Sequence, residues 1–437
     1  MGARETALNA LIACRKNGAW SNGVLKEYTQ RDRLDRREAA LAARLCYGVM
    51  QNRARLDFYL KQLLTGKLRD LHPVVRDILH LGLYQLRLMD RIPDSAAVNE
   101  SVALAKKYCP KQKFAPGLCN AVLRNAVRNA ESLKEPTRLE DRYSHPAKLI
   151  EKLKSYVGKA RLERMLEANN QAPDTVVQVN TLRTTAEALA RMLEEEGVAA
   201  QPHPWLRDSL ILSGTGNLEQ LESFRQGLFY VQDAAAKLSV LCARIPKGSH
   251  VLDCCAAPGG KSFAAVMAME GTGTVCSCDV HEHKTILIEN GAKRLQLPGV
   301  SVFLQDATQY HPGWEAAMDV VIADVPCSGY GIIRKKPDIR YKDPDSMAEL
   351  PELQMKILER QASYVRPGGV LMYSTCTLVW EENEGLVKNF LKLHPEFSLE
   401  KLELPDIFPE NTTGMLALVP GDYDTDGFFI ARLRRNS

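Results

Sequence analysis

The stretch that decides the fold is VLDCCAAPGGKS, which runs from Val251 to Ser262. A short β-type run ends at Asp253, and small residues with the pair Gly259-Gly260 separate it from a helical segment. A strand that passes through such a turn into a helix lets a ligand approach the backbone closely, and the helix N-terminus favours a negative group. The spacing matches neither the dinucleotide-binding G-x-G-x-x-G pattern nor the P-loop. On its own the turn is equally compatible with a purely structural role.

Beyond Gly227, short β-rich runs alternate with helical segments. The runs cover residues 250–254, 274–278, 300–304, 319–323 and 370–374. Such alternation predicts a parallel, doubly wound sheet, so residues 227–437 are expected to form a Rossmann-like α/β domain. Residues 428–433 predict a late strand at an antiparallel edge of this sheet.

Acidic residues stand at the ends of the first four of these predicted strands. Asp279 follows Asp253 by about 26 residues, Asp306 comes after the third strand, and Asp324 ends the fourth. A carboxylate at the tip of the second strand is placed to accept hydrogen bonds from ribose hydroxyls, and Asp306 is placed near an adenine edge. One such acid is more often a cap or a surface residue. Four in register predict a nucleoside cofactor.

Two further loops, both expected at the carboxyl edge of the sheet, contain a cysteine. Residues 324–331 read DVPCSGYG around Cys327, and residues 374–377 read STCT around Cys376. Ligands bind at this edge in doubly wound sheets, so both thiols are placed to face one substrate.

A pair of thiols suits one chemical problem. Carbon 5 of cytosine is a poor nucleophile, but a thiolate that adds to carbon 6 makes carbon 5 enamine-like and able to take a methyl group. The addition needs a deprotonated sulfur and a donor on the ring nitrogen, and a second group must then remove the carbon 5 proton. Either cysteine alone is more often a small buried hydrophobe, and the residues do not say which of the two attacks.

Residues 1–140 place apolar side chains at three- and four-residue spacing, which predicts an all-helical domain. The expected helices cover residues 37–50, 73–89, 96–108 and 114–128, with Ser95 as the N-cap of the third. About 25 Lys and Arg against about 14 Asp and Glu give this part a net charge of roughly +11, while the remainder carries roughly −7. The asymmetry favours contact with a polyanion, although solvated helix faces would show the same charge.

Between these domains, residues 141–226 predict a small α/β module that serves as an RNA-binding or linker domain. Residues 175–180 and 206–212 have the composition of strands, and residues 185–196 have a helical pattern.

Length and composition limit the number of domains and exclude several classes of protein. The chain has 437 residues, which favours two or three domains. No stretch reaches the roughly 18 to 20 apolar residues of a membrane span, and the N-terminus lacks the apolar core of a secretory signal. The 11 cysteines form no disulfide-scaffold pattern, so a cytoplasmic protein with free thiols is expected. Cys254, Cys255, Cys276 and Cys278 include no C-x2-C pair, and no metal is expected.

The blocks at residues 253–262, 324–331, 374–377 and 381–384 resemble, in the same order, the signature blocks of the RNA cytosine-5 methyltransferases. Asp426-Gly427-Phe428-Phe429 is similar to that family's terminal strand, so the resemblance spans residues 231–437. Residues 97–102 (AVNESV) and 120–124 (NAVLR) look like the RNA-binding helical domain of the antitermination factor NusB. This fusion is characteristic of the family members that methylate 16S ribosomal RNA, and residues 333–339 (IRKKPDI) also fit that subgroup.

The resemblance implies a class I methyltransferase domain that uses S-adenosyl-L-methionine and forms a covalent adduct with carbon 6 of one cytosine in 16S rRNA. Cys376 is then the nucleophile, Cys327 assists release of the methylated base, and Asp324 lies near the cytosine. The implied cofactor contacts are Cys255, Ala256, Ala257, Pro258, Gly259, Gly260, Lys261, Asp279, Asp306 and Asp324. Cys254, Ser262, Tyr330 and Trp380 depart from the family's usual residues; none removes a reacting group, and the last two are expected to flank the substrate pocket.

Two other functions stay open at this point. The first is a non-catalytic RNA-binding or antitermination protein on a methyltransferase scaffold, which the intact pair Cys327 and Cys376 argues against. The second is a cytosine-5 methyltransferase for tRNA or 23S rRNA, which only the NusB-like domain argues against. The expected partner is 16S rRNA, in the small ribosomal subunit or an assembly intermediate, and the chain is expected to be a monomer without a membrane or metal partner.

Overall fold

The computed structural model describes residues 2–17 and 19–437, which divide into two compact units. The helical unit comprises Met1–Lys152, Leu166–Gln171 and Ile333–Lys342. The sheet unit comprises Leu153–Met165, Ala172–Ile332 and Asp343–Ser437. The chain therefore leaves the sheet unit after Ile332, contributes a ten-residue arm to the helical unit, and returns at Asp343.

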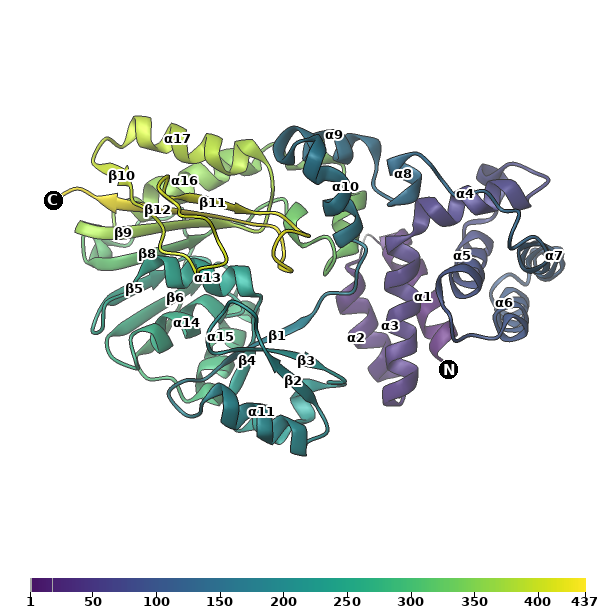
Figure 1. Ribbon diagram of the computed structural model, residues 1–437, viewed down its shortest axis with the longest axis horizontal. Coiled ribbons are helices and arrows are strands. Elements are labelled where there is room, and N and C mark those ends of the chain that lie inside the picture. Colours follow the sequence, from purple (N-terminus) through teal and green to yellow (C-terminus); the bar gives the residue numbers. More distant parts are fainter. Residues whose placement is uncertain (1, 18) are drawn as a thin grey trace. The chain divides into compact units, whose positions relative to one another are not determined.

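The helical unit is built as the apolar spacing predicts. Its main helices are α1 (Ala3–Asn17), α2 (Ser21–Arg31), α3 (Arg36–Gln51), α4 (Arg53–Leu63), α5 (Pro73–Leu88), α6 (Asp94–Tyr108) and α7 (Ala115–Arg128), followed by the short α8 (Leu139–Arg142) (Figure 1). Leu8, Leu45, Leu56, Ile78 and Leu123 are fully buried in their common core. The N-cap assigned to Ser95 is wrong, because α6 begins one residue earlier, at Asp94 after Pro93.

The arm, residues 333–342, is anchored in the helical unit by Arg340. This side chain is fully buried, in the 3-10 helix Pro337–Tyr341. Its guanidinium donates to the carbonyl of Gln51 (2.9 Å), to Oδ1 of Asn170 (2.8 Å) and to the carbonyl of Asn169 (3.2 Å). In addition, the Asp338 carboxylate accepts hydrogen bonds from the backbone N and the hydroxyl of Ser21 (3.2 and 2.6 Å) at the start of α2. Residues 333–339 thus fold with the helices.

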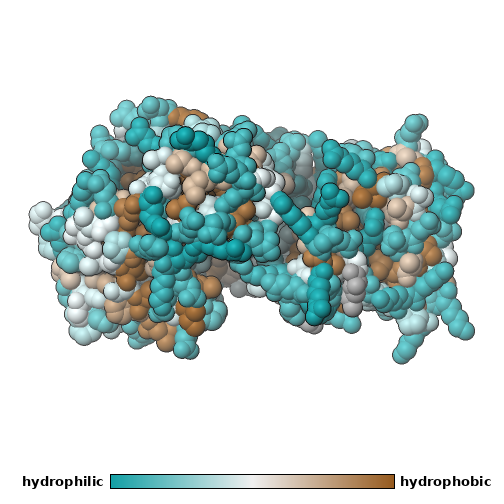
Figure 2. Space-filling model, turned by 90° about the horizontal axis from the view of Figure 1, so that it is seen from below, coloured by the Kyte–Doolittle hydropathy of each residue, from teal (hydrophilic) through white to brown (hydrophobic). Residues whose placement is uncertain are grey.

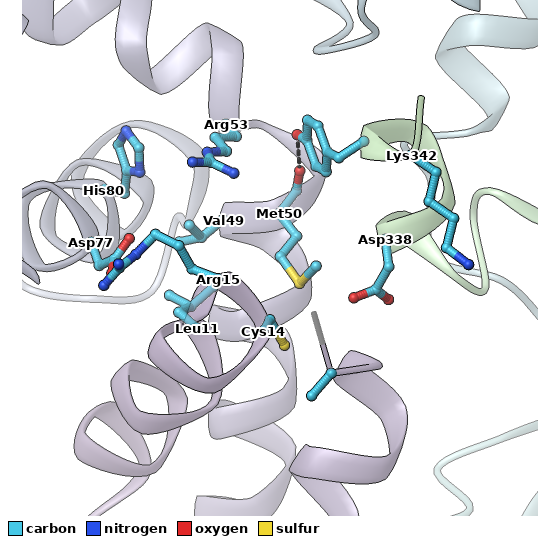
Figure 3. Close-up of a pocket in the computed structure, with 12 residues that line it drawn as sticks. Leu11, Cys14, Arg15, Val49, Met50, Arg53, Asp77, His80, Asp338 and Lys342 are labelled. Carbon is cyan, nitrogen blue, oxygen red and sulfur yellow. Dashed lines mark hydrogen bonds and ion pairs between the residues drawn. The ribbon is translucent and has the colours of Figure 1, made fainter. Parts of the chain in front are cut away.

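A cavity of about 220 Å³ lies between α1, α3, α5 and the arm (Figure 3). Leu11, Cys14, Val49 and Met50 supply its apolar wall, and the arm supplies Asp338, Tyr341 and Lys342. The Tyr341 hydroxyl donates to the Met50 carbonyl (2.5 Å), the bond drawn as a dashed line in Figure 3. Because one wall belongs to the arm, the cavity requires the arm to be docked.

Replacing Arg340 with Ala should destabilise the helical unit by about 3 kcal/mol, since several buried acceptors lose a charged donor. Denaturant unfolding of the full chain measures this. Arg128→Ala, an exposed position on α7, is the control and should change stability by less than about 0.5 kcal/mol. Equal stability of the two variants would show that the arm does not anchor the helices.

The sheet unit contains a small antiparallel sheet in the order β2-β3-β1-β4. Its strands are β1 (Thr175–Val179), β2 (Ala199–Pro202), β3 (Ser209–Ser213) and β4 (Phe229–Val231), packed against α11 (Ala186–Glu195). The predicted strand at 206–212 begins later, at Ser209, after Asp208 with its φ of +55°. The strand β4 lies beyond residue 226, so this sheet draws on the segment expected to start the third domain.

The large sheet has eight strands among the described residues, in the order β10-β12-β9-β8-β5-β6-β7, with β11 also pairing with β12. The parallel strands are β5 (His250–Asp253), β6 (Thr274–Asp279), β7 (Val300–Leu304), β8 (Met318–Asp324) and β9 (Val365–Thr375). The antiparallel strands are β10 (Phe397–Leu399), β11 (Met415–Leu418) and β12 (Phe428–Arg435). The strand β5 lies between β6 and β8, which is the topological switch point where ligands bind in such folds.

One sequence prediction about this sheet is wrong. The strand β12 is antiparallel as expected, but it is not an edge, because it pairs with β9 on one side and with β10 and β11 on the other. Phe429, Ile430 and Ala431 at its centre are fully buried. The apolar run therefore reflects a strand covered on both faces rather than an exposed border.

Helices cover both faces of the large sheet (Figure 1). One face packs against α13 (Ala234–Ala243) and α14 (Gly260–Ala268), with α15 (Glu282–Leu295) beside α14. The other packs against α16 (Leu350–Ala362) and α17 (Glu384–Leu393). The face of the molecule seen in Figure 2 is mostly hydrophilic, with apolar residues in separate patches. In the described part of the chain, no helix combines the length and apolarity that crossing a membrane requires.

Candidate active site

The loop after β5 turns back tightly against the end of β6. The backbone N of Ala256 donates to the Cys278 carbonyl (2.8 Å), and the N of Gly259 donates to the Ala256 carbonyl (2.7 Å). Gly259 has a φ of +108°, and a Cβ there would lie 2.3 Å from the ring of Phe263. Only glycine fits this position, and the bare backbone forms the cradle that a ligand at the N-terminus of α14 would use.

Asp253 supports this loop through a buried hydrogen-bond network. It is fully buried, it accepts a hydrogen bond from the Ser262 hydroxyl (2.8 Å), and Ser262 accepts one from Ser277 (2.7 Å). Burial raises the pKa of Asp253 to about 7. The sequence grouped Asp253 with the strand-end acids, and the structure places it under the loop as a support. Ser262, at the position where the family commonly has Thr, serves in the same network.

Asp279 and Asp306 lie on neighbouring strand ends, since the backbone N of Gln305 donates to the Asp279 carbonyl (3.1 Å). Asp279 is nearly buried, accepts from the His281 N (3.1 Å), and lies 3.7 Å from the Lys284 ammonium. Asp306 is exposed, and its Oδ1 accepts from the N and the hydroxyl of Thr308 (2.8 Å each). Both acids are at the expected edge of the sheet, with Asp306 the more solvated of the two.

Asp324 is held between two donors. Its Oδ2 lies 2.6 Å from the ammonium of Lys261, and its Oδ1 accepts from the Ser374 hydroxyl (2.7 Å). Burial lowers the pKa of Lys261, but the charge and hydrogen bond of Asp324 outweigh it and leave that pKa raised. Lys261 is therefore a cation and Asp324 its anion. The pair joins the loop after β5 to the ends of β8 and β9.

The two cysteines lie side by side. The sulfurs of Cys327 and Cys376 are 3.2 Å apart, and both thiols are free. The backbone N of Gly331 donates to the Cys376 carbonyl (2.9 Å), which ties the two loops together. The hydrogen bond with Cys376 and burial both raise the pKa of Cys327 well above its usual range. Cys327 therefore keeps its proton, which is available for a hydrogen bond to the sulfur of Cys376.

Three residues of this region were not understood from sequence alone. Ser374 was quoted only as part of a motif. Its position at the end of the predicted strand 370–374 was the available signal, and the structure places it opposite Asp324 in the register. Tyr330 is buried, and its hydroxyl forms no hydrogen bond within residues 2–17 and 19–437. Trp380 is half-exposed, with the ammonium of Lys388 4.7 Å from its ring centre. Whether Tyr330 and Trp380 flank the substrate stays a prediction.

Comparison with known proteins decides the family. A family model described as the 16S rRNA methyltransferase RsmB/F matches residues 242–434. The probable ribosomal RNA small subunit methyltransferase B of Bacillus subtilis is 35% identical over 99% of this chain and 98% of its own length. The ribosomal RNA small subunit methyltransferase B of Salmonella typhi is 32% identical over 98% of each chain. This chain belongs to the RsmB/F family of 16S rRNA methyltransferases.

The other domains are matched as well. The NusB family model covers residues 1–128, and the model of the RsmF/B-like ferredoxin-like domain covers residues 145–219. The crystal structure of PH0851 is similar over 99% of both chains, with 26% identity and a TM-score of 0.82. That of NSun6 from Pyrococcus horikoshii with SFG covers 67% of this chain and 98% of its own at a TM-score of 0.60; its 21% identity supports the fold alone. The expected fold class of a NusB-like helical domain, a small α/β domain and a Rossmann-like methyltransferase domain is confirmed.

This RsmB/F member is an S-adenosylmethionine-dependent rRNA methyltransferase. The residues fit that cofactor: the Gly259 cradle has no room for a side chain, and Asp279 ends the neighbouring strand. No cluster of three or more His, Cys, Asp or Glu side chains arranged for a metal occurs among the described residues.

Replacing Gly259 with Ala should weaken cofactor binding. An L-residue at this φ costs about 1 to 3 kcal/mol, and relief of the strain moves the loop, so affinity should fall roughly 5- to 150-fold. Calorimetric titration with S-adenosylhomocysteine measures the change. Gly66→Ala, whose Cβ meets nothing within 4 Å, is the control. An unchanged affinity in Gly259→Ala would remove this loop from the cofactor site.

Proposed function

We propose that this enzyme methylates carbon 5 of a specific cytosine in 16S rRNA through a covalent adduct between Cys376 and carbon 6. The observation that carries the proposal is the pair of free thiols 3.2 Å apart, beside the Asp324–Lys261 ion pair. A methyltransferase that modifies an oxygen or an amino nitrogen has no use for two adjacent thiols. A carbon that must first be made nucleophilic needs one thiol to add and a second group to remove a proton.

The first step is addition of the Cys376 thiolate to carbon 6. A carbon–sulfur bond forms, and the electron pair of the ring double bond moves toward the ring nitrogen. Lys261 is the donor for the nitrogen or the adjacent carbonyl oxygen, because Asp324 keeps it protonated. Asp324 can in turn accept a hydrogen bond from the exocyclic amino group of cytosine. S-adenosylmethionine supplies the electrophilic methyl group that the activated carbon 5 takes.

The last step is release of the base, in which Cys327 removes the carbon 5 proton. Once the sulfur of Cys376 is bonded to carbon it carries no charge, so one cause of the raised pKa of Cys327 disappears. Cys327 then loses its proton to solvent and takes the proton from carbon 5. The ring double bond re-forms, the carbon–sulfur bond breaks, and Cys376 is again a thiolate.

The target cytosine must reach these thiols with one face of its ring exposed. Carbon 6 must be approached from the face of the ring, which is covered in a stacked helix, so the cytosine is single-stranded or flipped out. The basic helical unit, with its NusB-like sequence, is the proposed docking element for the surrounding RNA.

Transfer of a labelled methyl group to 16S rRNA should fall to background in Cys376→Ala, because the thiolate that adds to carbon 6 is then missing. Scintillation counting of the purified RNA is the readout, and Cys276→Ala, a thiol on β6, is the matched control. Transfer that survives in Cys376→Ala would exclude this cysteine as the nucleophile.

Cys327→Ala should accumulate a protein–RNA adduct that resists denaturant, because addition proceeds while release is blocked. A shifted band on a denaturing gel measures the adduct. If Cys376→Ala accumulates it instead, the roles of the two cysteines are reversed.

The target RNA is tested by bisulfite mapping of ribosomal RNA from cells with and without this protein. One cytosine in 16S rRNA should become sensitive to bisulfite when the protein is absent. A change confined to 23S rRNA or tRNA would keep the chemistry and replace the substrate.

A further inference from the structure

A buried carboxylate, Glu382, lies between the two cysteine loops. It is 3% exposed, in the 3-10 helix Trp380–Glu382 that follows the Cys376 loop. Within the described part of the chain, no basic side chain forms an ion pair with it. Its partners are neutral hydrogen-bond donors. Buried polar groups are held by their hydrogen bonds, so the partners of this carboxylate show which residues it positions.

The carboxylate holds the Cys327 loop through Ser328. Its Oε2 accepts from the backbone N of Ser328 (3.0 Å), and its Oε1 accepts from the Ser328 hydroxyl (2.6 Å). Since the Ser328 hydroxyl gives its hydrogen to Glu382, it accepts from the hydroxyl of Thr377 (2.6 Å). Ser328 directly follows Cys327, and Thr377 directly follows Cys376. One carboxylate thus fixes the neighbours of both sulfurs.

A second set of hydrogen bonds to Glu382 comes from α16. The amide Nε2 of Gln354 donates to Oε2 of Glu382 (2.8 Å) and to the carbonyl of Pro326 (2.9 Å). The Cys327 residue is therefore held on both sides, through Pro326 and through Ser328. Glu382 itself is fixed by the Tyr373 hydroxyl, which donates to its backbone carbonyl (2.6 Å) from β9.

We propose that Glu382 is a positioning residue that sets the spacing of Cys327 relative to Cys376 and so controls release of the methylated base. This inference rests on the proposed two-cysteine function and deepens it. The carboxylate is buried beneath the two loops and acts through Ser328 and Gln354 on the place of the Cys327 sulfur.

Two conservative substitutions separate shape from charge. In Glu382→Gln the amide oxygen can replace Oε2, and the NH2 group can donate to the Ser328 hydroxyl. The hydrogen bonds of residue 382 to Ser328 and Gln354, which together form a clamp on the Cys327 loop, can therefore all be kept without the charge. In Glu382→Asp the charge is kept, but the side chain is one methylene shorter and cannot reach both donors. If the clamp acts through its geometry, Glu382→Gln should retain most of the turnover and Glu382→Asp should not.

The experiment measures turnover on 16S rRNA and the fraction of enzyme in the denaturant-resistant RNA adduct. In Glu382→Asp, turnover should fall on the order of 10- to 100-fold, as for a small misplacement of a catalytic group, and the adduct should accumulate. The KM for RNA should change little. Glu381→Asp, the same substitution at the exposed neighbouring residue, is the matched control and should behave like the parent enzyme. A merely structural defect would lower addition and release together and leave no adduct.

Folding is checked by cofactor affinity in each variant. Ser328→Ala, which removes one hydroxyl and keeps the backbone bond, should accumulate the adduct in the same direction to a smaller extent. In the double variant Cys327→Ala with Glu382→Asp, release should be no slower than in Cys327→Ala alone, because both changes act on the same group.

The outcomes distinguish the two proposals. If Cys327→Ala itself forms no adduct, the two-cysteine function fails. If Cys327→Ala forms the adduct while Glu382→Asp behaves like Glu381→Asp, only the clamp is overturned. A Gln variant as impaired as the Asp variant would also overturn it, since the charge and not the geometry would then matter.

Discussion

The pairing register between β8 and β9 is the constraint on which the site depends. Asp324 at the end of one strand lies opposite Ser374 at the end of the other, and the two side chains share a hydrogen bond. Cys327 follows three residues after Asp324, and Cys376 follows two residues after Ser374, so this register brings the sulfurs to one place. A slip of one residue would turn every side chain of the moved strand to the opposite face. The buried interior of both strands excludes such a slip.

The same edge of the sheet combines binding and chemistry. The loop after β5 supplies bare backbone at Gly259 and a cation at Lys261, and the cation is neutralised by Asp324 of the next strand in space. A donor in the first turn of α14, an acceptor at the end of β8 and two thiols in the loops directly after β8 and β9 thereby lie at one edge of the sheet. Catalytic groups held on rigid elements lose little freedom when the substrate binds.

The helical unit is linked to this edge through the chain itself. The arm begins six residues after Cys327 and carries Arg340, whose two terminal guanidinium nitrogens donate to acceptors within the helical unit. Residues 333–339, which resemble the subgroup with the NusB-like fusion, thus help to dock the arm in the helical unit. Residues 333–342 therefore belong to the helical unit, although the chain on either side of them belongs to the sheet unit.

Much of the fold and of the candidate site was predictable from the sequence, because periodic apolar patterns and strand-end residues are local signals. The five parallel strands, the four expected N-terminal helices and the NusB-like fusion were predicted. The short strands β2 and β4 were not, since three or four residues give no periodicity. The interior position of β12 depends on β10 and β11, which carry only short apolar runs. The roles of Arg340 and Glu382 rest on partners far away in the chain, and a single sequence does not reveal such pairings.

The central claim is that Cys376 attacks carbon 6 of a cytosine in RNA. The most direct test uses 16S rRNA that contains 5-fluorocytidine, in which fluorine replaces the proton that must leave, so the adduct cannot resolve. After incubation with S-adenosylmethionine and digestion, mass spectrometry locates the nucleotide on a peptide. The account predicts that the peptide containing Cys376 carries it, together with the transferred methyl group. A nucleotide on the peptide containing Cys327, or no covalent nucleotide at all, would contradict it.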